Sequence, residues 1–348
     1  IRGEQVAGMR DRNITIGGTE YVWKLGDIIY STPTVVSKPM ERYNVYYGDI
    51  AYAEFFKHWK NRGVTVYVGA NDGMLHAFKG GTFTEGDDPD TTKVEHGFYS
   101  KTEDPATDED LGEERWAYIP HNLLPHLRWL TSVEYPHVYY VDAKPKVTDV
   151  RIFDDDADHP NGWGSILIGG MRMGGEAITL VDDFNGDGTV DAPRTFRFAY
   201  FVLDITNPSR PTLLGELTHP DMGLTISYPA VARLEASHGF DSPENDEWFA
   251  IMGSGPFDCD AVSNQKGRVF VYHLKLSDGT IDMDGAGLVQ TILTSENKAI
   301  MASPVTMDLN LNYNVDTIYI GDSYVDGTAE RGKMFRISTR SNNNPAPN

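Results

Sequence analysis

The chain is poor in cysteine, because Cys259 is the only one among its 348 residues. A single cysteine excludes an internal disulfide and any metal site built from several thiolates. It says little about the compartment, since a chain of this length can bury a core without disulfides. Long apolar runs are also missing, and no segment approaches the roughly 18 apolar residues that a membrane-spanning helix needs. The sequence therefore predicts no transmembrane segment.

Basic residues are scarce as well. The chain has 30 Lys and Arg against 51 Asp and Glu, which gives a formal net charge of −21. Nucleic acid and anionic membrane surfaces both require a basic face that displaces their counterions, so neither is expected as a partner. The chain begins at Ile1 without an initiating methionine or a signal sequence. We therefore expect a fragment or a processed product.

Motifs of the common enzyme classes are absent: the sequence has no G-x-S-x-G, no P-loop and no H-E-x-x-H. Histidines could in principle supply an acid or a base, as at His76, His121, His126 and His137. The HNLLPH segment lacks the i, i+4 spacing of a helical zinc site, and Pro125 interrupts its helix. We interpret each of these histidines as a hydrogen-bonded loop or strand residue, and the sequence predicts no enzyme.

An internal repeat is the most informative feature that is present. Four segments carry a proline followed within two residues by valine: STPTVV (31–36), KPKVTDV (144–150), YPAVARL (228–234) and SPVTM (303–307). Three of them precede a strand-like run that turns at glycine into a second strand, at 66–78, 166–181 and 317–337. The YPAVARL copy precedes WFAIMGSGP and, beyond a loop, GRVFVYHL. Such a unit forms one antiparallel sheet, and repeated sheets of this kind are propeller blades.

The predicted fold is therefore all-β, a modified β-propeller of antiparallel sheets with short helical insertions. At about 40 to 50 residues per blade the chain has room for about seven blades. The alternative is a β-sandwich in which the Pro-Val pairs are coincidental. The expected helices are Ala51–Asn61 and His121–Trp129, the second broken by Pro125. The expected boundaries are an N-terminal lead-in at 1–22, the propeller at 23–340 and a C-terminal tail at 341–348.

Two segments leave room for more than one interpretation. Glu85–Glu114 is acidic and without a strand pattern, which predicts a mobile surface loop. Aromatic residues crowd the segment around the first expected helix, where they can either pack the helix onto a sheet or dock a partner protein or a surface sugar. We favour packing. These aromatics are Tyr43, Tyr46, Tyr47, Tyr52, Phe55, Phe56 and Trp59.

The sharpest chemistry lies in the segment DFNGDGTVD. It places Asp183, Asn185, Asp187 and Asp191 at loop positions one, three, five and nine, and Thr189 at position seven offers its carbonyl. Oxygen ligands that alternate with spacers suit a hard cation, and the two glycines supply the left-handed backbone of a tight turn. Arg194 stands where an EF-hand has its bidentate glutamate. The pattern therefore predicts a short Ca²⁺ loop, the alternative being an ordinary acidic turn.

A second segment, DLNLNYNVD, repeats the spacing. Asp308, Asn310, Asn312 and Asp316 occupy the same four positions, and Asn314 is at position seven. With two carboxylates and no glycine, its expected Ca²⁺ affinity is lower. Asn312 and Asn314 are expected to help the turn, because asparagine adopts positive φ more readily than other non-glycine residues. We predict Ca²⁺ here too, against a structural turn rich in asparagine.

Five motifs together resemble the C-terminal propeller of PilY-type proteins, the tip-associated adhesins and assembly factors of type IV pili. In chain order they are WKLGDIIYSTPTVV (23–36), YVGANDGMLHAF (67–78), WAYIPHNLLPHL (116–127), FVLDITNP (201–208) and SPVTMDLNLNYNVDTIYIGD (303–322). The resemblance runs from Trp23 to about Ile337. A-x-D-G-x-L-x-A alone also occurs in quinoprotein propellers, whereas five motifs in order are more specific.

The resemblance implies a propeller at the pilus tip or outer surface of a bacterium, acting in pilus biogenesis and adhesion. It implies Ca²⁺ held in a late D-x-[DN]-x-[DN]-x-x-x-D loop, which falls on Asp308, Asn310, Asn312 and Asp316 with the carbonyl of Asn314. The DFNGDGTVD loop would be an additional site. Minor pilins of the tip complex are the implied partners, together with a host or surface ligand. No Arg-Gly-Asp tripeptide is present to support integrin-type adhesion.

One enzyme class shares the propeller signatures. Quinoprotein dehydrogenases typically close their quinone pocket with a disulfide between adjacent cysteines. Cys259 alone cannot form that disulfide. A quinoprotein-like dehydrogenase therefore stays the alternative to a non-enzymatic calcium-binding propeller.

Overall fold

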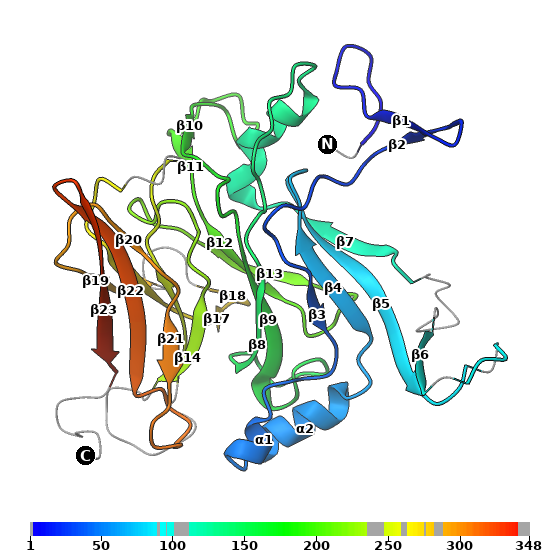
Figure 1. The fold of residues 1–348 in the computed structure, drawn as a ribbon, viewed down its shortest axis with the longest axis vertical. Coiled ribbons are helices and arrows are strands. Elements are labelled where there is room, and N and C mark those ends of the chain that lie inside the picture. The colour runs from blue at the N-terminus through cyan, green and yellow to red at the C-terminus, as the bar shows by residue number, and fades with distance from the viewer. Residues whose placement is uncertain are drawn as a thin grey trace.

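The computed structural model of the chain describes residues 3–88, 91–94, 96–100, 111–234, 247–258, 263–274, 276–281 and 288–339. These residues fold mainly into antiparallel sheets that stand side by side (Figure 1). Short helices lie at the two ends of the sheets. The predicted all-β class is therefore confirmed. Cys259 and the expected tail 341–348 lie outside the described residues.

The first two larger sheets contain the N-terminal half of the chain. One has the strand order β3-β4-β5-β6, with β7 also paired to β5, and the other has the order β13-β12-β9-β8. The strands of the first sheet are β3 (Thr34–Val36), β4 (Val64–Gly69), β5 (Leu75–Glu85), β6 (Gly97–Ser100) and β7 (Glu114–Tyr118). The strands of the second are β8 (Lys146–Arg151), β9 (Trp163–Gly170), β12 (Tyr200–Asp204) and β13 (Thr212–Leu217).

The other two larger sheets contain the C-terminal half. The third sheet has the order β14-β15-β16-β19, formed by Ala230–Leu234, Glu247–Gly253, Arg268–His273 and Leu288–Leu293. In the fourth, β22 (Thr317–Asp326) pairs with β20 (Ala299–Met301), β21 (Val305–Met307) and β23 (Ala329–Ser338). Three two-stranded hairpins complete the list: β1 (Asn13–Ile16) with β2 (Thr19–Val22), β10 (Ile178–Leu180) with β11 (Arg194–Phe196), and β17 (Leu276–Ser277) with β18 (Thr280–Ile281).

Each Pro-Val segment becomes an edge strand of one larger sheet. The strands β3, β8, β14 and β21 begin directly after Pro33, Pro145, Pro229 and Pro304. Proline has no N–H to donate to a ladder, so it is tolerated at the start of a strand and at a sheet edge. Neighbouring sheets touch through these strands, β3 against β8 and β14 against β21. The Pro-Val repeat of the sequence thus forms the strands through which neighbouring sheets are in contact.

The expectation of about seven blades is wrong for the described residues, which form four larger sheets. The reason is the length of each unit. The Pro-Val prolines lie at least 75 positions apart, and insertions such as the β10–β11 hairpin take up the difference. Dividing the chain length by the length of a standard blade therefore overestimated the number of larger sheets.

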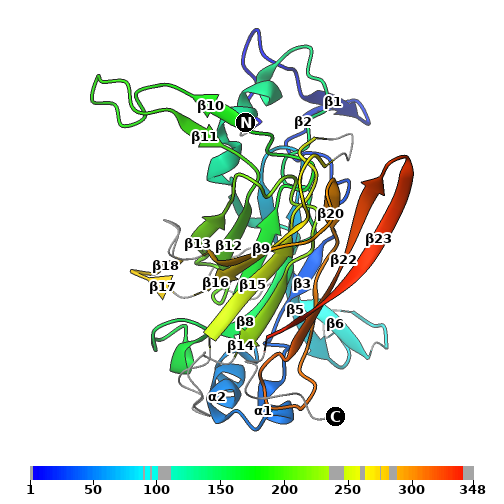
Figure 2. The ribbon, with the colours of Figure 1, turned by 90° about the vertical axis from the view of Figure 1, so that its left-hand side faces the viewer.

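One predicted hairpin is also wrong. The 66–78 and 317–337 runs form the expected antiparallel pairs β4–β5 and β22–β23. In the 166–181 run, however, β9 pairs with β8 and β12, whereas β10 pairs with β11. The returning strand of this sheet is therefore β12, and β10–β11 is an insertion that projects from the body (Figure 2).

The acidic segment 85–114 contains a short strand that its composition did not predict. Residues Gly97–Ser100 form β6, which pairs with the end of β5. Phe83 and Tyr99 face each other across this pair, with ring centroids 5.4 Å apart. Two aromatic residues on opposite strands thus outweigh the acidic composition of the segment.

The aromatic segment forms α1 (Tyr43–Tyr46) and α2 (Ile50–Trp59), as the favoured packing interpretation requires. Asp49 caps α2 by accepting the Tyr52 N–H at 2.8 Å. Tyr52 and Phe55 are fully buried, and the Tyr52 hydroxyl donates to Asp149 of β8 at 2.7 Å. The second predicted helix is the 3₁₀ helix η1 (His121–Thr131), which contains Pro125. A short 3₁₀ turn, η2 (Pro160–Gly162), precedes β9.

The core lies between the sheets and under α2. Its largest cluster includes Tyr52, Trp163, Tyr200, Met252 and Phe270, which come from α2 and from β9, β12, β15 and β16. All eight residues of β9 are buried, as expected for a central strand covered on both faces. Among the described helices none has the length and hydropathy to cross a bilayer.

Candidate metal centre

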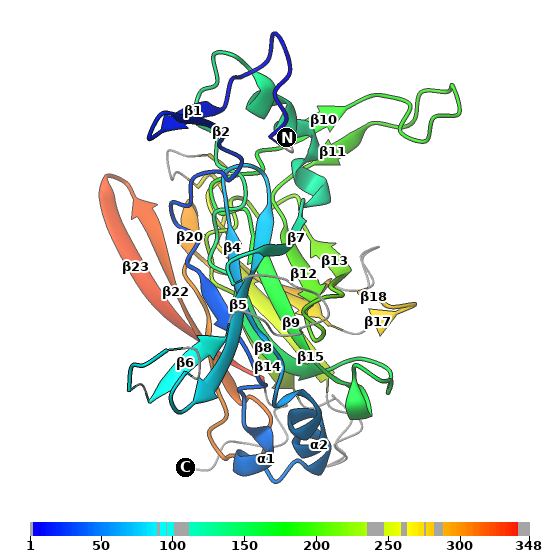
Figure 3. The same cartoon turned by 90° about the vertical axis from the view of Figure 1, so that its right-hand side faces the viewer.

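The two predicted calcium loops lie at opposite ends of the molecule. The Asp183 loop (183–191) connects β10 with β11 in the hairpin that projects near η1 (Figures 1 and 2). The Asp308 loop (308–316) connects β21 with β22 and lies at the end that holds α1 and α2 (Figure 3). The predicted ligands of each loop thus lie along a single turn between two strands, and the two sets are far apart.

The two loops share one hydrogen-bond pattern when each is numbered from its first aspartate. The carboxylate at position one accepts the N–H groups of positions five and six. The amide oxygen at position three accepts the N–H of position five, and the side chain at position five accepts that of position seven. The carboxylate at position nine accepts the N–H of position two. Two different sequences thus close in the same way.

The corresponding distances are similar. From Asp183 to the position-five and position-six nitrogens they are 3.2 and 2.7 Å, and from Asp308 they are 3.2 and 2.9 Å. Asp191 and Asp316 lie 2.8 and 2.7 Å from the position-two nitrogen of their own loop. Their surroundings differ, because Asp316 is buried, whereas the Asp183 loop is mostly exposed.

The backbone turns at the same two positions in both loops. In the first loop Gly186 and Gly188, at positions four and six, have φ values of 74° and 85°. In the second, Leu311 and Tyr313 hold these positions with φ values of 57° and 80°. The expectation that the asparagines at positions five and seven provide the positive φ is therefore wrong. Since a left-handed conformation costs an L-residue about 1–2 kcal/mol, contacts elsewhere must hold the second loop.

Tyr313 supplies such contacts. Its ring stacks on Tyr47 at a centroid distance of 4.3 Å and lies 5.0 Å from the ring of Tyr43. The Arg233 guanidinium covers the ring at 4.0 Å, and the Tyr313 hydroxyl lies 3.4 Å from Asp49, the cap of α2. Aromatic and cation–π contacts of this kind offset the strain of the turn. They also connect the loop to α1 and α2.

Sequence reasoning missed this role of Tyr313. The signal was nevertheless present, because an aromatic residue stands at the position where the other loop has Gly188. A bulky residue at a position that requires positive φ is unusual and indicates that its side chain is held by tertiary contacts.

Backbone N–H groups stabilise the ionised form of two aspartates in the first loop. The N–H of Gly188, with those of neighbouring loop residues, lowers the pKa of Asp183 below its usual value. The Thr189 N–H and the Asn185 side chain lower the pKa of Asp187. Both side chains therefore stay negatively charged, as cation ligands must be.

The donor atoms suit Ca²⁺ in kind. Both loops offer carboxylate, amide and carbonyl oxygens, and a carboxylate oxygen that accepts one N–H keeps a second lone pair for a cation. In the part of the chain that the structure describes, no three His, Cys, Asp or Glu side chains are gathered as metal ligands. The three carboxylates of the first loop are therefore spread along its turn and are not gathered at one point.

The comparisons with known proteins identify the family. The family described as "PilY1 beta-propeller domain" matches residues 25–346, which include both loops. The chain belongs to the PilY1 beta-propeller family. The resemblance found in its motifs is thereby confirmed.

Curated relatives of this PilY1 beta-propeller chain are named as type IV pilus biogenesis factors. A PilY1 homolog of Xylella fastidiosa is 30% identical over 67% of this chain and 14% of its own length. PilY1 of Pseudomonas aeruginosa strain UCBPP-PA14 is 29% identical over 92% of this chain and 21% of its own length. The chain thus spans about a fifth or less of these relatives. The crystal structure of the Pseudomonas aeruginosa PilY1 C-terminal domain aligns with TM-score 0.48 and 24% identity, covering 83% of this chain and 43% of that one.

Histidines in this PilY1 beta-propeller have hydrogen-bond partners in the fold. His126 Nε2 lies 2.8 Å from the Glu176 carbonyl, and His137 Nε2 lies 2.9 Å from Asp27. His76 contacts Asp72 at 3.1 Å and also bonds to Glu114. These contacts agree with the interpretation of these three histidines as structural residues.

Proposed function

We propose that this domain is a non-enzymatic, calcium-binding propeller that acts in type IV pilus biogenesis and adhesion. Its place would be extracellular, at the pilus tip or the outer surface of the bacterium, with minor pilins of the tip complex as partners. Membership of the PilY1 beta-propeller family and the names of the relatives as type IV pilus biogenesis factors support the pilus assignment. The net charge of −21 favours partners other than nucleic acid.

The observation that carries the calcium proposal is the shared geometry of the two loops. Glycines at positions four and six explain the turn in one loop, and Tyr313 packing explains it in the other. Two loops that reach the same hydrogen-bond pattern with different residues are expected if this pattern is needed for cation binding. A divalent cation would use the alternating oxygens and neutralise the charge that the aspartates concentrate there.

The proposed ligands come from positions one, three, five, seven and nine of each loop. The position-seven residue would contribute its carbonyl oxygen. In the first loop they are Asp183, Asn185, Asp187, Thr189 and Asp191, and in the second Asp308, Asn310, Asn312, Asn314 and Asp316.

The second loop is the better candidate for an effect on pilus function. Tyr313 contacts Tyr47 directly after α1 and Asp49 before α2. A conformational change in the loop would therefore alter the surface that these helices form. Ca²⁺ occupancy would set how rigidly this surface is presented to a pilin and so influence the balance of pilus extension and retraction.

A genetic test separates this function from an enzymatic one. In a host strain that lacks the gene, the wild-type gene should restore surface pili and twitching, whereas Asp316→Ala should restore them poorly. Asp326→Ala serves as the control, because Asp326 is an exposed aspartate at the β22–β23 turn of the same sheet. Equal rescue by Asp316→Ala and wild type would contradict the proposed role of the loop.

The enzymatic alternative has its own test. The purified domain should not reduce a dye with alcohols after incubation with a quinone cofactor and Ca²⁺. Quinone-dependent alcohol oxidation would overturn the non-enzymatic proposal and favour a quinoprotein-like dehydrogenase.

A further inference from the structure

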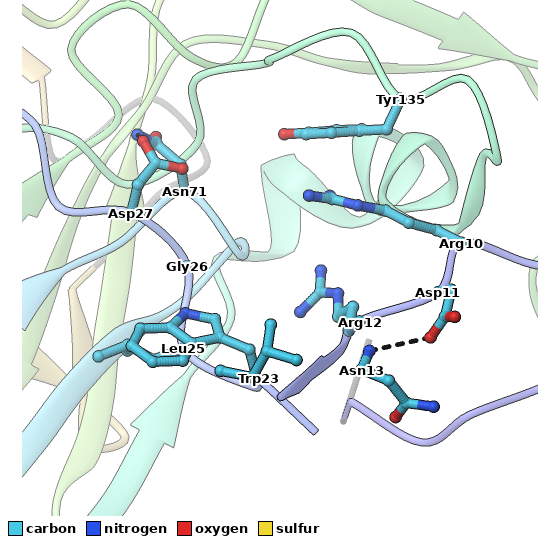
Figure 4. A pocket seen from close by; sticks show the side chains of 11 residues that line it. Arg10, Asp11, Arg12, Asn13, Trp23, Leu25, Gly26, Asp27, Asn71 and Tyr135 are labelled. Atoms are coloured by element: carbon cyan, nitrogen blue, oxygen red, sulfur yellow. Dashed lines mark hydrogen bonds between the residues drawn. The ribbon is translucent and has the colours of Figure 1, made fainter. Parts of the chain in front are cut away.

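Residues of the β1–β2 hairpin help to line a pocket of about 320 Å³ (Figure 4). This hairpin lies far from α1 and α2 (Figure 1). The volume of the pocket is at the lower end of the range of about 300–1,000 Å³ that small-molecule sites occupy. Its polar and aromatic lining includes Arg10, Asp11, Arg12, Trp23, Asp27, Asn71 and Tyr135, and Asp11 accepts hydrogen bonds from the Gln5 side chain and the Asn13 N–H. The lining residues come from three separate segments, so the pocket exists only in the folded chain.

Two arginines form the cationic end of this pocket. The guanidinium of Arg10 lies flat on the Tyr135 ring, with Cζ 4.0 Å from its centroid. Tyr135 is itself held by two hydrogen bonds between its hydroxyl and the Val138 backbone. Arg12 donates one N–H to the Lys24 carbonyl at 3.1 Å. Among the described residues neither arginine has an ion pair, which is unusual in a chain with 51 acidic residues.

This arrangement leaves donors for a ligand. Stacking on a ring uses the face of a guanidinium and leaves its in-plane N–H groups available. Arg12 uses one of its five N–H groups within the fold. In Figure 4 the two guanidinium groups point toward the same space. A carboxylate is the planar anion that such paired donors fit best.

The opposite end of the pocket offers acceptors and a flat apolar surface. Asp27 accepts hydrogen bonds from Asn71 at 3.0 Å and His137 at 2.9 Å, and its carboxylate stays partly exposed. Trp23 is 56% exposed and presents its indole to the pocket (Figure 4). Asn71 is buried, so this end of the pocket is built on the core of the first larger sheet.

We infer that this pocket binds an acidic sugar, such as a uronic or sialic acid residue of a surface polysaccharide. Arg10 and Arg12 would hold the carboxylate, Trp23 would cover the apolar face of the ring, and Asp27 would accept its hydroxyl groups. Each part of the pocket thus meets a different part of the same ligand. A bare anion would leave Trp23 and Asp27 unused, and a neutral sugar would leave the arginines unused.

The negative net charge of the chain means that an anionic ligand gains no long-range attraction to it. A charge of −21 repels anions at long range, but beyond about 8 Å this repulsion is screened at physiological ionic strength. Binding of an acidic ligand therefore depends on short-range contacts with the two arginines. The pocket would give the proposed adhesive role a ligand class. Its test needs neither Ca²⁺ nor pili, so the two proposals can fail separately.

The test is a calorimetric or NMR titration of the whole chain with galacturonic acid and N-acetylneuraminic acid. Galactose and acetate serve as the neutral and the bare-anion probes. At least one acidic sugar should bind, and more tightly than galactose or acetate. Arg10→Gln and Arg12→Gln should each weaken this binding about tenfold or more. The matched control is Arg128→Gln, an exposed arginine beside Trp129 outside the pocket, which should bind as wild type.

The outcomes are decisive in both directions. Trp23→Ala should also weaken binding of the acidic sugar while leaving the thermal unfolding of the domain nearly unchanged, because Trp23 is largely exposed. The inference is overturned if neither acidic sugar binds, if acetate binds as tightly as the acidic sugars, or if Arg12→Gln binds like wild type. It is likewise overturned if galactose binds equally well, since the arginines would then have no role.

Discussion

Tyr313 and Tyr47 stack face to face, with ring centroids 4.3 Å apart and ring planes 9° apart. Tyr313 belongs to the Asp308 loop and Tyr47 follows α1, so the contact joins residues that are distant in the chain. It keeps a non-glycine residue at a φ of 80°. The predicted Ca²⁺ loop is thus part of the packed structure around α1 and α2, whereas its counterpart lies in a projecting hairpin.

The first prediction concerns Tyr313→Gly. Glycine removes the strain of the positive φ, worth about 1–2 kcal/mol, but it also loses the aromatic packing, worth about 3–5 kcal/mol for a buried ring and less for this partly buried one. We expect a net decrease in the free energy of unfolding, measured by urea denaturation. The control is Tyr324→Gly, because Tyr324 of β22 is likewise partly buried but has no positive φ. A Tyr313→Gly variant more stable than wild type would show that the stack does not hold the loop.

The second prediction concerns pH. Burial lowers the pKa of His76, but the carboxylates of Asp72 and Glu114 outweigh it and raise the pKa above its usual 6.5. The same balance, with Asp204 and Asp156, raises the pKa of His159. Because the folded-state pKa is raised, the stabilisation is fully present below about pH 6.5 and is lost as the pH rises through the folded-state pKa.

The measurement is the free energy of unfolding between pH 6 and pH 9. It should fall with rising pH in the wild type, and His76→Gln with His159→Gln should make this fall smaller. His58→Gln, an exposed histidine on α2, should keep the wild-type profile. A double variant that keeps the full pH dependence would assign it to other groups.

The third prediction concerns Gly169 of β9. It pairs with Phe201 of β12, and a Cβ at this position would lie 2.1 Å from the Phe201 ring, which is fully buried. Gly169→Ala should destabilise the domain by about 1–3 kcal/mol through overpacking. Gly321→Ala in β22 is the matched control, because its Cβ would be 3.5 Å from the nearest atom. Equal thermal unfolding temperatures for the two variants would contradict this account of the sheet interior.

Much of the fold could be predicted from local sequence signals. Four edge strands begin directly after Pro33, Pro145, Pro229 and Pro304. Proline cannot donate a hydrogen bond to a strand ladder, and this property depends on that one residue alone. The spacing of oxygen-bearing residues likewise located both loops. Such signals act within a few residues and need no knowledge of tertiary contacts.

The remaining features depend on contacts between distant segments. Strand β9 pairs with β12, which follows the β10–β11 insertion in the chain. No local pattern in the 166–181 run predicts this pairing. The positive φ of Tyr313 depends on Tyr47 and Arg233. The grouping of Arg10, Tyr135 and Asp27 requires three segments to meet. These contacts become visible only when the fold is known.

The most direct test of the calcium proposal is a calorimetric Ca²⁺ titration of the purified, chelator-treated domain. The wild type should show two binding phases, because the two loops bind independently at opposite ends of the molecule and differ in their number of carboxylates. Asp187→Ala should remove the tighter phase, since its loop has three carboxylates and two glycines, and Asp316→Ala should remove the weaker one. Absence of Ca²⁺ binding would contradict the account, and loss of the tighter phase in Asp316→Ala would reverse the ranking of the two loops.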